Sequence, residues 1–288
     1  MPGTIAVLTM SKGRPEELLR QVDGLSVGSV PPDLHVVVSM GDRDLTRGRL
    51  PLGTDRWTTV VCPVPTDRRA LPLAAARNRA AREALEVGAD VLIFLDGDVI
   101  PGSRTLERYA DAVTGVSPAL RDLARPDGPV VWAGPVLQLP EPPDEHVGYP
   151  LGHLHKYGVR TPGTPALSPG ELRPETRWDY FHAVAFAMSP EDFRATGGFC
   201  EDYTGHGLED ADFAHVVHNA GGALVWVGGA TAYVQPRADL DRTQETRIAL
   251  RHAEVWRGRW GAEPAHPWLQ RLRGEGLLRL DEGRWGAA

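Results

Sequence analysis

Residues 91–95 form an unbroken apolar run, Val-Leu-Ile-Phe-Leu, and Asp96, Gly97 and Asp98 follow it directly. A short run that is apolar at every position predicts a strand buried on both faces, because a strand with one solvent-exposed face would alternate apolar and polar residues. Such strands are typical of parallel sheets that helices cover on both sides. The run therefore predicts an α/β fold that carries two acidic residues at the tip of a central strand.

The same alternation of strand and helix patterns extends through the first half of the chain. Strands are predicted at residues 4–9, 34–39, 57–61 and 91–95, and helices at residues 15–25 and 73–87. The second helix is rich in Ala, Arg, Glu and Leu, which favour helix, and Gly88 ends it. This order predicts a mostly parallel central sheet flanked by helices. Ligands of such sheets bind beyond the carboxyl ends of the strands.

The second half is less regular. Its pattern predicts helices at 104–113, from Ser189, from Glu209 and at 241–260, and strands at 130–139, 180–188 and 224–227. Residues 140–177 are instead rich in Pro, Gly, His and charged residues. A stretch this long without periodicity is usually functional or disordered. We interpret it as a mobile loop that helps to cover an active site, with a disordered insertion as the alternative.

Charge and cysteine content restrict the partners and the compartment. The net charge of −7 argues against nucleic acid or an anionic membrane as the main partner. Cys62 and Cys200 are the only cysteines, and their spacing suggests neither a zinc site nor a disulfide framework. The sequence shows no signal-peptide pattern and no apolar run of spanning length. We expect a soluble, cytoplasmic protein without a transmembrane segment.

Asp96 and Asp98 have the spacing of a cation site. Residues i and i+2 of an extended chain point the same way, about 7 Å apart, and the glycine between them lets a ligand approach. Mg2+ and Mn2+ are commonly held by one or two carboxylates together with substrate phosphates. The alternative is a solvated Asp-Gly turn at the end of a strand.

A second acidic cluster lies in the segment Gly-His-Gly-Leu-Glu-Asp-Ala-Asp, residues 205–212. Its acids begin a predicted helix, where the helix dipole stabilises negative charge in any protein. A carboxylate at such a place can also act as a general base on a hydroxyl group, because it is ionised at neutral pH. Both interpretations stay open from the residues alone.

Three motifs taken together resemble the glycosyltransferases of the GT-A fold. They are VLIFLDGD, the earlier AAARNRA, and the later block DYFHAVAFAMSPEDFRATGGFCEDYTGHGLEDADF. The first half looks like the large family 2 type, and residues 179–213 look like the C-terminal region of galactosyltransferases. The likeness covers roughly residues 4–235. It implies a catalytic domain at 1–237, with a nucleotide-sugar half at about 1–100, a catalytic half at about 101–237, and a C-terminal helical extension at 238–288.

The resemblance also implies roles for individual residues. Asp210 corresponds to the catalytic base, and Glu209 to a residue that orients the acceptor or the donor sugar. Asp96 and Asp98 correspond to metal ligands. The residues that correspond to contacts of the nucleotide sugar are Thr9, Arg14, Asp42 or Asp44, Arg77, Asn78 and Asp96. The chain departs from the family at residues 206–208, where His-Gly-Leu replaces the usual Trp approach. It departs again at 232–237, which lacks the later His ligand. Gln235 or His182 could then be the third ligand, or the aspartates and the diphosphate could hold the metal alone.

The activity implied is inverting transfer of a hexose, from UDP-hexose by preference, to a hydroxyl of a small-molecule, peptide or glycan acceptor. Mn2+ or Mg2+ is the expected cofactor. Two other functions stay open. A sugar nucleotidyltransferase would also use paired acids and a metal, and a non-catalytic nucleotide-sugar-binding domain would account for the altered motifs.

Overall fold

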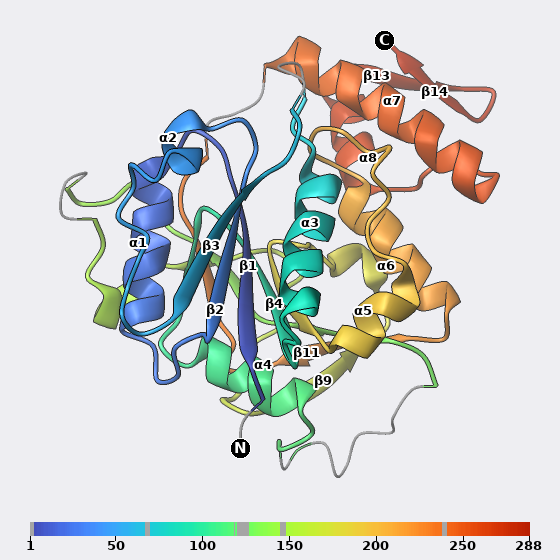
Figure 1. Cartoon of the computed structure of the whole chain (residues 1–288). Helices are drawn as coiled ribbons and strands as arrows, with labels where there is room; N and C mark the ends of the chain where they lie inside the picture. The colour runs from blue at the N-terminus through green and yellow to red at the C-terminus, as the bar shows by residue number, and fades with distance from the viewer. Residues whose placement is uncertain (1–2, 67–69, 118, 120–126, 145–147, 238–240) are drawn as a thin grey trace.

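The computed structural model describes residues 3–66, 70–117, 119, 127–144, 148–237 and 241–288. A central eight-stranded sheet has the strand order β3-β2-β1-β4-β10-β6-β11-β9, and helices cover both of its faces (Figure 1). One face packs against α3, α5 and α6, and the other against α1 and α4. The predicted α/β architecture with a mostly parallel sheet is confirmed.

The sheet consists of two parallel groups joined by an antiparallel strand. In the first group, β1 (Ile5–Ser11), β2 (Leu34–Ser39), β3 (Thr58–Pro63) and β4 (Val91–Asp96) are mutually parallel. In the second, β6 (Val130–Ala133) and β11 (Ala223–Val227) are parallel, and β10 (Ala185–Met188) runs antiparallel between β4 and β6. The edge strand β9 (Leu172–Glu175) is antiparallel to β11. The strand that ends in Asp96 therefore lies near the middle of the sheet.

The helices agree closely with the sequence pattern. They are α1 (Pro15–Ser26), α2 (Arg43–Thr46), α3 (Leu73–Glu86), α4 (Thr105–Val113), α5 (Pro190–Thr196), α6 (Glu209–Asn219), α7 (Arg242–Trp260) and α8 (Pro267–Gly274), with short 3-10 turns η2 (Leu151–Lys156) and η3 (Trp178–Tyr180). Ser189 caps α5 as expected, because its hydroxyl accepts a hydrogen bond from the Asp192 amide. Within the described residues, none of these helices combines the length and apolar character needed to cross a bilayer.

The predicted strand at 130–139 is two strands in two different sheets. After β6, the chain bends at Gly134, and β7 (Val136–Gln138) joins a second sheet of order β5-β12-β7-β8. The other members are β5 (Val99–Pro101), β8 (Val159–Arg160) and β12 (Ala232–Val234). A Cβ atom at Gly134 would lie 1.7 Å from the Ala230 carbonyl oxygen, so only glycine permits this bend. Residues 148–177, which belong to the segment expected to lack regular structure, carry η2, β8 and β9.

The C-terminal tail contains more than helices and is not a separate extension in space. After α7 and α8 it ends in a hairpin of β13 (Leu278–Asp281) and β14 (Arg284–Ala287), which the sequence analysis missed. The tail shares a small core with Tyr203 and Leu208, the residues that lead into α6. Its helices lie beside α6 at one end of the sheet (Figure 1). The tail is therefore placed to form part of a site at that end.

A cluster of phenylalanines packs between the sheet and α5 and α6. Phe94 of β4 stacks on Phe186 of β10 with ring centroids 4.4 Å apart, and Phe199 stacks on Phe213 of α6 at 4.1 Å. Phe213 also contacts Phe186, at 6.1 Å. Aromatic pairs in these geometries add to the stabilisation from buried apolar area. The cluster fixes α6, and with it the acids at the start of α6, against the central strands.

Truncation of Phe213 to Ala is expected to lower the free energy of unfolding by about 3–5 kcal/mol, because it leaves a cavity among four other aromatic rings. Equilibrium urea denaturation followed by tryptophan fluorescence measures this change. Val87→Ala is the control, because Val87 is 62% exposed and its loss is expected to cost less than about 0.5 kcal/mol. Equal costs for both variants would contradict this account of the core.

Candidate active site

Asp96 and Asp98 lie side by side at the carboxyl end of β4 because the backbone between them is tightly held. The Asp96 amide donates to the Val184 carbonyl at 2.9 Å, and the Gly97 amide donates to the Met10 carbonyl at 3.1 Å. A Cβ atom at Gly97 would lie 2.7 Å from that Met10 oxygen, so the middle residue must be small. Both aspartates are 7% exposed. The predicted acidic tip of the strand thus exists as a nearly buried pair of carboxylates.

A buried polar network supports this tip from below. The Gln21 side-chain amide donates to the carbonyls of Asp96 at 2.8 Å and Val99 at 3.0 Å. The Thr9 hydroxyl donates to Gln21 Oε1 at 2.8 Å, and His35 Nε2 lies 3.1 Å from the same hydroxyl. Burial lowers the pKa of His35 to about 4, so its ring is neutral. Thr9, expected to contact the nucleotide, is fully buried and instead helps to hold the Asp96 backbone.

Two arginines neutralise the aspartates. Arg77 of α3 donates to Asp96 Oδ1 at 3.2 Å and reaches Glu209 Oε1 at 3.5 Å. Arg237 donates to both oxygens of Asp98, through Nε to Oδ2 and through Nη2 to Oδ1 at 2.7 Å, and to Asp96 Oδ2 at 3.2 Å. Burial opposes the charge of Arg237, but Asp98 and Asp96 outweigh it and raise its pKa. All four carboxylate oxygens therefore accept a hydrogen bond from a guanidinium group.

The second acidic cluster forms the first turn of α6, as predicted. Leu208, at the N-cap, has φ of +67°, an unusual value that turns the chain sharply into the helix. Glu209 is buried, and burial together with the charge of Asp210 raises its pKa. Burial acts in the same sense on Asp210, but its Oδ2 lies 3.5 Å from His182 Nδ1, and this pairing lowers the pKa of Asp210 overall. Asp210 is therefore an ionised carboxylate at neutral pH.

The approach to α6 is clamped by the C-terminal tail. Gly207 has φ of +103°, and a Cβ atom there would lie 2.4 Å from the Trp268 ring of α8. His252 of α7 contacts the Gly207 carbonyl through Nδ1 and the Thr204 carbonyl through Nε2 at 3.1 Å. Burial lowers the pKa of His252 to about 4, so the ring is neutral and its single N–H donates to one of these two carbonyls. The glycines of this segment thus serve close packing, and the packing positions Glu209 and Asp210.

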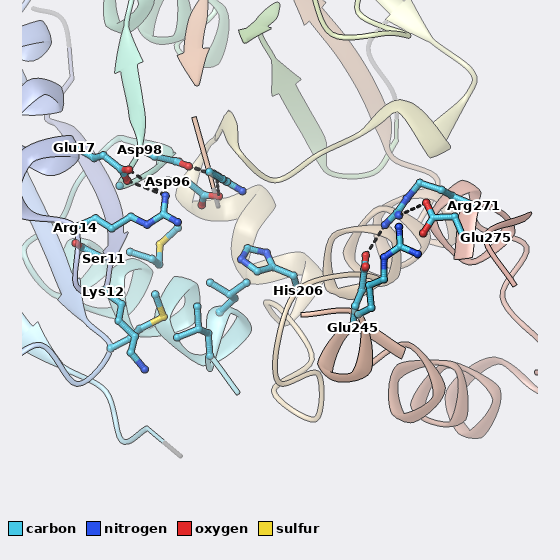
Figure 2. Close-up of a pocket in the computed structure, with 17 residues that line it drawn as sticks. Ser11, Lys12, Arg14, Glu17, Asp96, Asp98, His206, Glu245, Arg271 and Glu275 are labelled. Carbon is cyan, nitrogen blue, oxygen red and sulfur yellow. Dashed lines mark hydrogen bonds and ion pairs between the residues drawn. The ribbon is translucent and has the colours of Figure 1, made fainter. Parts of the chain in front are cut away.

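A cavity of about 620 Å³ opens in front of the aspartates. It is lined by Met10, Ser11, Lys12, Arg14, Glu17, Met40, Leu71, Leu73, Asp96, Gly97, Asp98, His206, Arg237, Arg242, Glu245, Arg271 and Glu275. Figure 2 shows the acidic tip on one side of this cavity, Glu245, Arg271 and Glu275 on the other, and His206 between them. The described parts of the expected covering loop, 140–144 and 148–177, contribute no lining residue. The far wall comes from α7 and α8 instead.

The other predicted site residues divide into those at the cavity and those with local roles. Arg14 lines the cavity and pairs with Glu17 at 3.0 Å. Asn78 does not line it: its side chain donates to the Phe199 carbonyl at 2.9 Å and accepts from the Phe199 amide at 2.8 Å. Asp42 caps α2 and accepts a hydrogen bond from the Gly13 amide at 3.1 Å. Asp210 is not among the lining residues either, although Arg77 links its neighbour Glu209 to Asp96.

The two aspartates have the oxygen donors that a hard divalent cation prefers. The two candidates for a third ligand, however, have other partners: Gln235 Oε1 accepts from Arg20 at 3.2 Å, and His182 pairs with Asp210. Among the described residues, no cluster of three or more His, Cys, Asp or Glu side chains has the arrangement of a metal site. The donor chemistry thus fits Mn2+ or Mg2+, while the charge in front of the aspartates is supplied by Arg237.

Sequence reasoning missed Arg237 and His206 as residues of this site. Arg237 was included only in a stretch noted for lacking histidine, yet it follows β12 closely, and the amide of Gln235 donates to the Asp98 carbonyl at 2.9 Å. An arginine that directly follows a strand ending beside an acidic pair indicates that this arginine can pair with the acids. His206 could be found from its place in the altered glycine-rich approach.

Comparison with known proteins agrees with the resemblance that the sequence motifs indicate. A family model described as the N-terminal domain of galactosyltransferase matches residues 170–236, which include the predicted galactosyltransferase-like segment. Validoxylamine A glucosyltransferase from Streptomyces hygroscopicus subsp. limoneus is 30% identical over 202 residues, which is 67% of this chain and 43% of that protein. The chain thus spans less than half the length of this curated relative.

Solved structures share the fold at low sequence identity. S. aureus TarS in complex with UDP superposes with a TM-score of 0.56 at 14% identity, covering 88% of this chain and 65% of that one. The mannosyltransferase PcManGT from Pyrobaculum calidifontis, in complex with GDP-Man and Mn2+, gives 0.55 at 18% identity, covering 96% and 69%. With the family model and the glucosyltransferase relative, this shared fold identifies the chain as a member of the GT-A glycosyltransferases.

Proposed function

We propose that this chain transfers a hexose from a nucleoside diphosphate sugar to an acceptor hydroxyl with inversion of configuration, using Mn2+ or Mg2+. The observation that carries the proposal is the buried bridge from Asp96 through Arg77 to Glu209, which joins the two acidic clusters in one network. UDP-hexose is the favoured donor, supported by UDP in TarS and by the glucosyltransferase relative. The GDP-Man complex of PcManGT supports GDP-sugars as the alternative class of donor.

On the donor side, the cavity of about 620 Å³ is within the usual size of small-molecule sites, roughly 300–1,000 Å³. Asp98, assisted by Asp96, would hold the cation. A bound cation would neutralise the diphosphate leaving group, a role worth several kcal/mol at a transition state. Lys12 and Arg14 line the same cavity and can reach phosphate oxygens. Gln21 holds the carbonyls of Asp96 and Val99, so the backbone that carries the carboxylates is fixed in place.

On the acceptor side, Asp210 would take the proton of the attacking hydroxyl. It is ionised at neutral pH, and its side chain is 18% exposed, so it is both charged and reachable. Glu209 is buried and linked to Arg77, and its role is to orient the first turn of α6. A single displacement assisted by one base inverts the anomeric carbon. The relative that is a validoxylamine A glucosyltransferase supports a small-molecule acceptor, with peptides and glycans as other classes.

Asp210→Asn is expected to reduce sugar transfer by roughly 10²–10⁴-fold, because it removes the general base without changing the size of the side chain. Donor binding, measured as thermal stabilisation by UDP-hexoses and GDP-hexoses, is expected to stay within about twofold of wild type. Asp202→Asn is the matched control, since Asp202 is an exposed acid nearby that does not line the cavity. A fully active Asp210→Asn variant would reject this residue as the base.

Arg77→Ala is expected to lower the free energy of unfolding by about 3–5 kcal/mol, because it leaves the buried Glu209 carboxylate without a counter-charge and leaves Asp96 paired with Arg237 alone. Chemical denaturation measures the loss. Arg82→Ala, on the same helix, is the control: its side chain is 55% exposed, and removal is expected to cost less than about 0.5 kcal/mol. If the two variants were equally stable, the bridge would not be the constraint that unites the site.

Removal of divalent cations with EDTA is expected to stop sugar transfer, and addition of Mn2+ or Mg2+ in excess is expected to restore it, because the leaving diphosphate loses its neutralising charge. Initial rates at a series of free metal concentrations measure the dependence. Treatment with EDTA already saturated with Mn2+, which has no chelating capacity left for Mn2+, separates chelation from direct inhibition. Unchanged rates in EDTA would show that the aspartates serve another purpose.

A further inference from the structure

The two arginines that neutralise Asp96 and Asp98 differ in their freedom to move. Arg77 is 3% exposed, contacts the Phe199 ring at 5.2 Å, and is held between two carboxylates. The side chain of Arg237 is 34% exposed and lines the cavity. Arg77 is thus a fixed part of the core, whereas Arg237 stands at the entrance with open space beside it.

Arg237 occupies the position from which a cation would face the aspartates. It bonds both oxygens of Asp98 and one oxygen of Asp96, and Arg77 bonds the remaining one. Each aspartate therefore already has a guanidinium partner, although Arg77 is shared with Glu209. A divalent cation added to this arrangement would gain little net attraction and would be repelled by Arg237 at short range. Cation binding at Asp98 requires Arg237 to leave.

A diphosphate offers Arg237 an alternative partner. Phosphate oxygens accept the same paired hydrogen bonds from a guanidinium group that a carboxylate does. The cavity that Arg237 lines lies directly in front of the aspartates, where the donor diphosphate is proposed to bind. A nucleoside diphosphate that arrives with its cation can therefore supply both charges that the exchange needs, a cation for the aspartates and an anion for Arg237.

We propose that Arg237 is an exchangeable counter-ion that holds Asp96 and Asp98 until the cation and the nucleoside diphosphate bind together, and that it then transfers to the diphosphate. This inference rests on the proposed function, because it concerns the cation site of that reaction. It makes cation and nucleotide binding cooperative, and the cooperativity is reciprocal because it is a coupling between two equilibria. Mn2+ alone binds weakly to wild type, since it has to displace Arg237 without compensation.

The test measures Mn2+ affinity by electron paramagnetic resonance of free Mn2+, with and without UDP or GDP. For wild type, either UDP or GDP is expected to tighten Mn2+ binding at least tenfold. Arg237→Gln is expected to tighten the binding of Mn2+ alone at least tenfold, and to reduce the gain from nucleotide to below threefold. Arg237→Lys keeps the charge but not the paired geometry, and it is expected to fall between wild type and Arg237→Gln. Circular dichroism and thermal melting establish that each variant is folded.

Two controls separate this inference from the proposed function. Arg242→Gln removes the same charge from the same cavity and is expected to leave the Mn2+ affinity unchanged. Within the part of the chain that the structure describes, Arg242 has no hydrogen bond to Asp96 or Asp98. Asp98→Asn in the Arg237→Gln background is expected to abolish Mn2+ binding. If the double variant loses Mn2+ binding but Arg237→Gln alone does not bind Mn2+ more tightly than wild type, the exchange is rejected and the cation site is retained. If Mn2+ still binds without Asp98, the cation site itself is rejected.

A further outcome would also overturn the exchange. The wild-type protein could bind UDP or GDP equally well in EDTA and in Mn2+, and the Arg237→Gln variant could lose that binding. This result would mean that Arg237 permanently replaces the metal. Isothermal titration with each nucleotide under both conditions detects this result.

Discussion

Arg77 holds Asp96 and Glu209 together inside the protein, although these carboxylates come from segments more than a hundred residues apart in the chain. Burying ionised groups is costly unless each has a well-placed partner, so the bridge forms only when α3, β4 and α6 are in their correct positions. Asn78, the next residue of α3, binds the backbone of Phe199, whose ring stacks on Phe213 of α6. One helix therefore sets the distance between the two acidic clusters.

The strands and helices that enclose the site were predictable wherever burial leaves a local pattern. Strand β2 was predicted at its observed bounds because its apolar residues indicate a buried strand. Helix α3 was predicted to within one residue because its composition favours helix. The pattern failed where the partner is distant. The bend at Gly134 depends on the Ala230 carbonyl, and β9 is an edge strand whose partner is β11. Neither contact produces a periodic pattern of apolar residues in the sequence.

The position of the acids at the end of β4 and at the start of α6 was predictable, whereas their ion-pair partners were not, and the roles of these acids in binding and catalysis stay predictions. The position of Asp96 and Asp98 follows from the rule that parallel strands present ligands at their carboxyl ends. Thr9 and Asn78 were given a ligand's role, yet each has its hydrogen bonds satisfied within the protein. Arg237 was passed over because its importance comes from lying opposite the aspartates, which is a fact of three-dimensional packing. Polar residues can be named from a sequence more readily than the pairs they form.

The small core shared by the tail with Tyr203 and Leu208 has a consequence for how this chain can change. One wall of the cavity is built by the first hundred residues and the opposite wall by α7 and α8, and these walls pack into different cores. Substitutions in the tail can therefore reshape the far wall while the strands around Asp96 stay as they are. Exchange of α7 and α8 is therefore a modular way to change the far wall of the cavity while the strands around Asp96 stay constant.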